Sequence, residues 1–134
     1  MAVLGFSHLN VRTPDFARTL AFLRDALGME AAPPPRLDAT DKAAWIYDSN
    51  GGALLHLASA EILYSPTEIL PQVAPRGSGA IHHVAFSCSD YASMRARLIN
   101  AAVDFRENEP ETGVRQIFVE DPTGIMFELN FQES

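Results

Sequence analysis

The chain has 134 residues, 47% of them hydrophobic and 20% charged, a composition typical of one soluble globular domain. Its formal net charge of −7 argues against a nucleic-acid partner or an anionic membrane surface, because the ten Lys and Arg residues are scattered and form no basic patch. The single cysteine, Cys88, excludes an internal disulfide, so we expect a reducing cytoplasm; neither a secretory signal nor a membrane-spanning apolar stretch is visible.

The chain begins with a predicted strand and helix. Apolar and polar residues alternate from Phe6 to Arg12, which is typical of a half-buried strand. Thr13 is the expected N-cap of the helix, with Pro14 at the first helical position and Asp15 in the first turn. Gly28 is expected to end the helix in a left-handed conformation. The apolar face of this helix repeats at spacings of four, three and four residues, as Phe16, Leu20, Leu23 and Leu27.

A hairpin follows a proline-rich stretch from Pro33 to Asp41. Its first strand is predicted over Ala43–Asp48, and its return strand over Ala53–Leu57. The turn between them, Ser49–Gly52, contains an Asn-Gly pair that readily adopts the positive φ angles of a tight turn. The first part of the chain therefore predicts a β-α-β-β-β order, in which the first short strand of the meander has the weakest signal.

The second half of the chain repeats this order. Its predicted elements are a strand over Ile81–Cys88, a helix starting at Ser89-Asp90, a short strand or loop from Phe105, a strand over Val114–Glu120, a turn at Asp121–Gly124 and a last strand over Ile125–Phe131. We therefore expect a single α+β domain with two βαβββ modules, over about residues 4–57 and 81–131. A linker rich in Pro and Gly, over about residues 59–79, joins them.

Four polar residues occupy matching positions in the two modules. His8 and His83 lie in the first strands, and His56 and Glu128 lie in the closing strands. Successive side chains on a strand point to opposite faces, and the apolar ones must meet the helix. The four polar side chains are therefore expected on the face away from the helices. If the two curved half-sheets face each other, these side chains point into one shared concavity.

Three imidazoles and one carboxylate suit a divalent Zn, Fe, Mn, Co or Ni ion better than Ca or Mg. In an octahedral site, four protein donors leave two positions for substrate or water, which is a catalytic arrangement. An unpaired Glu128 in an apolar strand would be costly to bury, and a ligand role removes that difficulty. We predict His8, His56, His83 and Glu128 as metal ligands, with Glu128 and His56 as catalytic groups. His56 is alternatively an acid–base or supporting residue outside the ligand set.

Other residues are expected to line the same face. Candidate substrate-binding residues are Asn10, Arg12, Ser87, Arg115, Asn130 and Trp45. For Trp45 and Arg115, as for Tyr47 and Tyr64, packing explains the residue equally well. His82 is out of phase with His83 and is expected to be structural or to support its neighbour. Cys88 shares the parity of the core-facing residues and is expected to be an unreactive buried thiol.

Four segments taken in order resemble the vicinal oxygen chelate superfamily, which includes glyoxalase I, methylmalonyl-CoA epimerase, extradiol dioxygenases, and fosfomycin- and bleomycin-resistance proteins. The segments are Ser7–Val11, Phe22–Met29, Ile81–Phe86 and Asp121–Leu129. The resemblance covers nearly the whole chain. It implies a mixed, curved sheet around a central metal-binding cavity with the helices outside, and ligands from the first and last strands of each module. It also implies a homodimer, which exposed sheet edges favour.

His56 departs from the pattern of the glyoxalase I-like members, which usually carry a carboxylate there, and of the epimerase-like members, which usually carry Gln. The expected function is a metal-dependent lyase or isomerase acting on a small oxygenated substrate that is chelated through two vicinal oxygens. One alternative is an iron(II) extradiol-type dioxygenase, whose triad is matched by His8, His83 and Glu128. Another is a binding protein that sequesters a drug or metabolite without chemistry.

Overall fold

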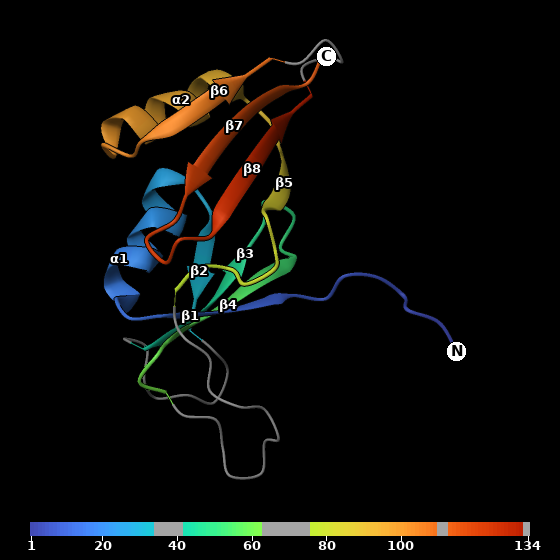
Figure 1. The fold of residues 1–134 in the computed structure, drawn as a ribbon, viewed down its shortest axis with the longest axis vertical. Helices are drawn as coiled ribbons and strands as arrows, with labels where there is room; N and C mark the ends of the chain where they lie inside the picture. Colours follow the sequence, from blue (N-terminus) through green and yellow to red (C-terminus); the bar gives the residue numbers. More distant parts are fainter. Residues whose placement is uncertain (34–41, 63–75, 110–112, 133–134) are drawn as a thin grey trace.

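Two four-stranded mixed sheets dominate the computed structural model of the protein, which describes residues 1–33, 42–62, 76–109 and 113–132 (Figure 1). The strand order is β1-β4-β3-β2 in the first sheet and β5-β8-β7-β6 in the second. In each sheet the first strand runs parallel to its neighbour, and the other pairs are antiparallel. The α+β class and the repeated βαβββ order are therefore confirmed.

The elements of module one are β1 (Leu9–Thr13), α1 (Phe16–Ala21), a π-helical continuation η1 (Phe22–Ala26), β2 (Glu30–Ala32), β3 (Ala43–Tyr47) and β4 (Ala53–Ser59). Those of module two are β5 (Val84–Cys88), α2 (Tyr91–Asn100), β6 (Phe105–Asn108), β7 (Arg115–Glu120) and β8 (Met126–Phe131). The short first strand of each meander, which had the weakest sequence signal, is present as β2 and as β6.

The N-cap of α1 differs from the prediction. Asp15, not Thr13, caps the helix, and its side chain accepts a hydrogen bond of 3.1 Å from the backbone N–H of Arg18. The Thr13 hydroxyl is buried instead and lies 2.7 Å from the hydroxyl of Thr19. At the other end, Gly28 has a φ of +73°, as expected for a left-handed residue after a helix.

The register of the strand pairs β1–β4 and β5–β8 confirms the internal repeat. β1 begins directly after His8, and β5 begins directly after His83, so both strands start later than predicted. Asn10 pairs with His56 in the first sheet, and Ala85 pairs with Glu128 in the second. Each closing-strand residue therefore lies opposite the position two residues beyond the histidine. The two pairs are structurally equivalent.

The apolar face of each sheet forms the core. Leu55 and Leu57 of β4 and Phe127 and Leu129 of β8 are at most 1% exposed. The ring of Phe22, from module one, stacks near that of Phe127 with centroids 6.4 Å apart, so the core is shared between the modules. Both helices lie on the same side of the molecule (Figure 1).

The sheets stay separate within the described residues, so no continuous sheet closes around a cavity there. No described strand pairs with the outer edge of β1 or of β5. Residues 1–6 extend away from the first sheet, and Val3 and Leu4 are 95% and 98% exposed (Figure 1). Most of the predicted linker, residues 63–75 with Tyr64, lies outside the described residues. The helices that the structure describes include none with the length and apolar character to cross a bilayer.

Candidate functional site

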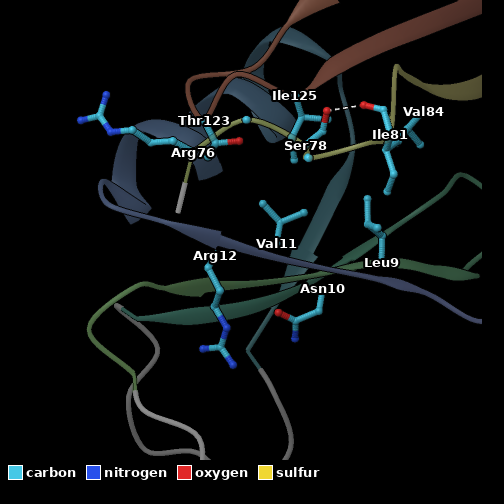
Figure 2. A pocket seen from close by; sticks show the side chains of 12 residues that line it. Leu9, Asn10, Val11, Arg12, Arg76, Ser78, Ile81, Val84, Thr123 and Ile125 are labelled. Carbon is cyan, nitrogen blue, oxygen red and sulfur yellow. Dashed lines mark hydrogen bonds between the residues drawn. The ribbon is translucent and has the colours of Figure 1, made fainter. Parts of the chain in front are cut away.

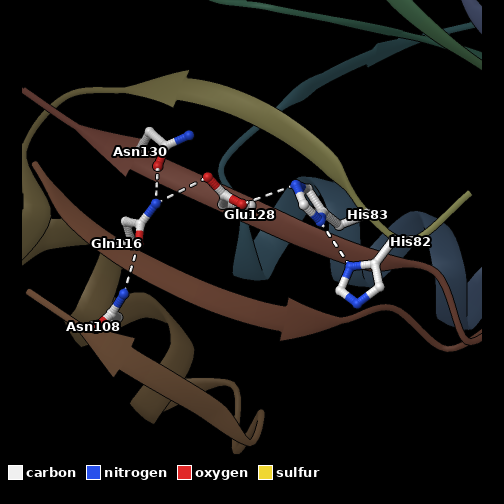
Figure 3. A network of polar contacts seen from close by, with 6 residues as sticks. All are labelled: His82, His83, Asn108, Gln116, Glu128 and Asn130. Carbon is white, nitrogen blue, oxygen red and sulfur yellow. Dashed lines mark hydrogen bonds and ion pairs between the residues drawn. The ribbon is translucent and has the colours of Figure 1, made fainter. Parts of the chain in front are cut away.

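His83 and Glu128 form a direct polar pair on the open face of the second sheet. His83 Nε2 lies 3.0 Å from Glu128 Oε2, and the Glu128 side chain is only 13% exposed (Figure 3). The pair exists because β5 and β8 are parallel neighbours whose alternation sends Phe127 and Leu129 into the core. Two ligand atoms that each lie about 2.1 Å from a metal ion, at a right angle to one another, are about 3 Å apart. The distance between His83 Nε2 and Glu128 Oε2 therefore fits two ligands of one ion as well as an ion pair.

An amide network holds the other oxygen of Glu128. Gln116 Nε2 donates to Glu128 Oε1 at 3.0 Å and to Asn130 Oδ1 at 2.9 Å (Figure 3). Asn108 Nδ2 in turn donates to Gln116 Oε1 at 2.8 Å. Sequence reasoning missed Gln116. The sequence pattern that could have revealed Gln116 is the alternation along β7. Because the neighbouring Ile117 faces the core, Gln116 must face the opposite side of the sheet.

His82 contacts the same group of residues. Its Nδ1 lies 2.9 Å from Nδ1 of His83, so one ring nitrogen donates a proton and the other accepts it (Figure 3). This contact supports the expectation that His82 assists its neighbour.

His56 and His8 both contact Trp45 in the first sheet. The Trp45 ring stacks on His56 with centroids 4.6 Å apart and an interplanar angle of 14°, and it meets His8 edge-on at 5.1 Å. Asn10 Nδ2 lies 3.1 Å from His56 Nδ1. Burial lowers the pKa of His56, and the positive charges of Arg12 and His8 lower it further. The predicted pocket wall Trp45 thus lies against both imidazoles.

The donors fit a divalent transition metal in type. His56 Nε2 is buried and has no hydrogen-bond partner in the part of the chain that the structure describes. Because the amide nitrogen of Asn10 donates to Nδ1, Nε2 carries the proton in the neutral ring, and its lone pair becomes available to a metal when the Asn10 amide turns its oxygen toward Nδ1. Within one chain, however, the described residues contain no cluster of three or more His, Cys, Asp or Glu side chains able to hold a metal. The expected convergence of four side chains is therefore not met in a single chain. Each sheet carries two of the four: His83 and Glu128 in direct contact on the second sheet, and His8 and His56, each against Trp45, on the first.

The remaining candidates divide between the two faces. Arg12 donates to the carbonyl of Ile62 at 3.4 Å, and Ser87 is exposed opposite Asn130 in the register of β5 and β8. Arg115 does not share this face, which corrects the expectation that it lies beside the other substrate-binding candidates.

Arg115 lies on the side of the helices because it is in phase with Ile117 along β7. Its guanidinium lies 3.6 Å from the centroid of the Tyr91 ring, and it pairs with Glu109 at 3.1 Å. Cys88 is half-buried, and burial raises the pKa of its thiol to about 11, which fits an unreactive cysteine.

A cleft of about 420 Å³ separates β1 from the segment 76–84 (Figure 2). Leu9 and Val11 point into it, whereas Asn10 and Arg12 leave β1 from the opposite face (Figure 2). None of the four predicted ligands is among the described residues that line this largely apolar cleft.

Comparison with known proteins decides the family. A family model described as the glyoxalase/bleomycin resistance protein/dioxygenase superfamily matches residues 5–129. The chain belongs to this superfamily. The resemblance inferred from the four sequence segments is thereby confirmed.

Solved structures of superfamily proteins share the fold of this chain. A lactoylglutathione lyase from Agrobacterium tumefaciens has a TM-score of 0.68 and 15% identity, over 98% of this chain and 96% of that one. A glyoxalase/dioxygenase from Nostoc punctiforme has a TM-score of 0.72 and 18% identity, over 98% and 92%. TioX from Micromonospora has a TM-score of 0.69 and 19% identity, over 96% and 99%. No curated protein matches the sequence significantly.

Proposed function

We propose that this superfamily member is a metal-dependent lyase or isomerase of the glyoxalase and epimerase type. Its substrate would be a small oxygenated molecule with two vicinal oxygens. The observation that carries the proposal is the 3.0 Å contact between His83 Nε2 and Glu128 Oε2. By register, Glu128 in the second sheet is equivalent to His56 in the first. A bound divalent ion would supply a Lewis acid that stabilises an enolate developing on the substrate.

Each site residue would have a role that matches the chemistry of its side chain. His8, His56, His83 and Glu128 would hold the ion. Glu128, or His56 through Nε2, would carry a proton between substrate atoms. The polar side chains on the same faces would bind and orient the substrate: Asn10, Arg12, Ser87 and Asn130. Trp45 would wall the site on the side of His8 and His56 and exclude water there.

We propose further that the working unit is a homodimer. Each chain offers one pair of donors in each sheet, and a second copy would bring the first sheet of one chain to the second sheet of the other. The outer edges of β1 and β5, with which no described strand pairs, support this arrangement, as does the exposed apolar segment at Val3 and Leu4.

An iron(II) dioxygenase is the second candidate, because of how His56 is held. Its Nδ1 contacts Asn10 and its ring stacks on Trp45, which suits a positioned residue outside the ligand set. His8, His83 and Glu128 would then form a two-histidine, one-carboxylate triad. A sequestering protein of the resistance type, which needs no metal, is the third candidate.

Metal analysis of protein purified without added metal tests these functions, followed by an activity screen with and without oxygen. A lyase or isomerase holds a divalent ion and works equally well in both atmospheres. Iron together with oxygen-dependent cleavage of catechols would replace this proposal by the dioxygenase. Tight binding of small molecules by a metal-free protein would contradict both enzymes. His8→Ala and Glu128→Ala should each abolish metal binding, whereas Glu30→Ala, on the exposed strand β2, should not.

A further inference from the structure

We propose that Gln116 is a positioning residue that sets the orientation of two functional groups at once. It would fix the Glu128 carboxylate with Oε2 toward His83, and it would turn the amide nitrogen of Asn130 toward the open face of the sheet. The inference rests on the proposed function, because it concerns how the metal ligand Glu128 is presented. Gln116 lies on β7, between the strands that carry Asn108 and Glu128.

The hydrogen bonds of Gln116 are fixed by the chemistry of its neighbours. An ionised carboxylate only accepts hydrogen bonds, so the side-chain nitrogen of Gln116 must face Glu128. Its two N–H groups reach Glu128 Oε1 at 3.0 Å and Asn130 Oδ1 at 2.9 Å. Its oxygen is left for Asn108, whose amide nitrogen lies 2.8 Å away. Rotating the Gln116 amide by half a turn would place oxygen against oxygen, so this network allows one orientation.

For Glu128 the consequence is an asymmetric carboxylate. Oε1 accepts from Gln116, and Oε2 alone faces His83 Nε2 at 3.0 Å. A carboxylate with one oxygen engaged in this way offers a cation its other oxygen rather than both. Glu128 would therefore be a single-oxygen ligand, which leaves more of the ion open to the two oxygens of a chelating substrate.

For Asn130 the consequence is a fixed donor. Its Oδ1 accepts from Gln116, and its amide nitrogen points away from Gln116 (Figure 3). Asn130 lies opposite the exposed Ser87 in the register of β5 and β8. By holding Asn130 in this orientation, Gln116 places the Asn130 amide N–H donor next to the Ser87 hydroxyl. The two groups together suit a substrate oxygen.

Gln116→Met tests this role, because Met has a similar length and makes none of the three hydrogen bonds. Co²⁺ is titrated into metal-free protein, and both its dissociation constant and its visible absorption spectrum are recorded. We expect the variant to bind Co²⁺ about 10- to 100-fold more weakly, the usual effect of removing a group that supports a ligand. We also expect an altered spectrum, since Glu128 could then turn both oxygens to the ion. Gln132→Met makes the same exchange at an exposed position and should match the wild type.

The outcomes separate this inference from the proposed function. If wild-type protein binds Co²⁺ and Gln116→Met binds it with unchanged affinity and spectrum, the role of Gln116 is overturned and the metal site stands. If wild-type protein does not bind Co²⁺, both proposals fail. Thermal melting shows whether Gln116→Met folds. If it does not, Asn108→Ala tests the role of Gln116 instead, because this substitution removes only the exposed outer partner of Gln116. A loss of Co²⁺ affinity smaller than about 10-fold supports the inference, whereas no loss overturns it.

Discussion

His56 of β4 is restrained by residues of its two neighbouring strands, β1 and β3. Asn10 contacts Nδ1, Trp45 stacks on the ring, and Nε2 is buried. Burial is the main cause that lowers its pKa, and the charges of Arg12 and His8 add to it. The lowered pKa favours the neutral imidazole, the form that can bind a metal or accept a proton.

The lowered pKa of His56 predicts a pH dependence of stability for the metal-free protein. The unfolded chain binds the proton more readily, so the stabilisation is complete above the ordinary pKa of 6.5 and is lost as the pH falls through the lower folded value. We expect the free energy of unfolding, measured with urea, to fall more steeply below pH 6.5 in the wild type than in His56→Gln. Parallel pH profiles for the two proteins would contradict this assignment.

Cys88 should be chemically quiet in the folded protein. A thiol with a pKa of about 11 instead of 9.0 carries about a hundredfold less thiolate near pH 8. We expect an aromatic disulfide reagent to modify it at least about a hundredfold more slowly in the native state than in urea. Equal rates in the two states would show that the thiol is accessible and ionised.

Single residues also mark the limit of prediction from sequence. Alternation and matching positions in the repeat were enough to predict that His83 and Glu128 lie on one face, because neighbouring core residues fix that face. The same rule assigns Arg115 to the helix side only once Ile117 is known to be buried. The contact of Gln116 with Glu128 depends on strand register, which one sequence does not specify.

At the scale of elements, α1 depends on its N-cap. Asp15 satisfies the backbone N–H of Arg18, a donor that the helix itself leaves free. We expect Asp15→Ala to lower the free energy of unfolding by about 0.5–2 kcal/mol, measured by urea unfolding. Asp104→Ala, at an exposed aspartate outside the helices and strands, is the matched control and should change stability little. Equal effects of both substitutions would mean that the cap contributes nothing.

The order of elements was predictable because each half carries the same strand, helix and meander pattern, with Gly28 and the Asn50-Gly51 turn as local stop signals. The residues at which the helices and strands begin and end were less predictable. Residues 6–8 alternate like a strand but precede β1, whose pairing with β4 begins only at Leu9, opposite Leu55. Local pattern cannot reveal where pairing between two strands begins.

At the scale of the whole molecule, each sheet carries two of the four predicted donors, and no described strand pairs with the outer edge of its first strand. The sequence repeat predicts that the pairs are equivalent, and the register agrees. It does not predict how the sheets face each other, because that depends on packing between modules and between copies. We propose that a second copy of the chain brings the four predicted donors together around one metal ion.

Mixing two defective variants tests whether the metal site is shared between two copies. His8→Ala impairs the first sheet's pair and Glu128→Ala the second's, so neither protein alone should bind metal. In a mixed dimer with sites between chains, one site receives both defects and the other receives none. After the subunits are unfolded and refolded together in equal amounts, we expect metal bound at about a quarter of all sites, measured by elemental analysis. Metal binding that does not recover on mixing would contradict a site shared between two copies.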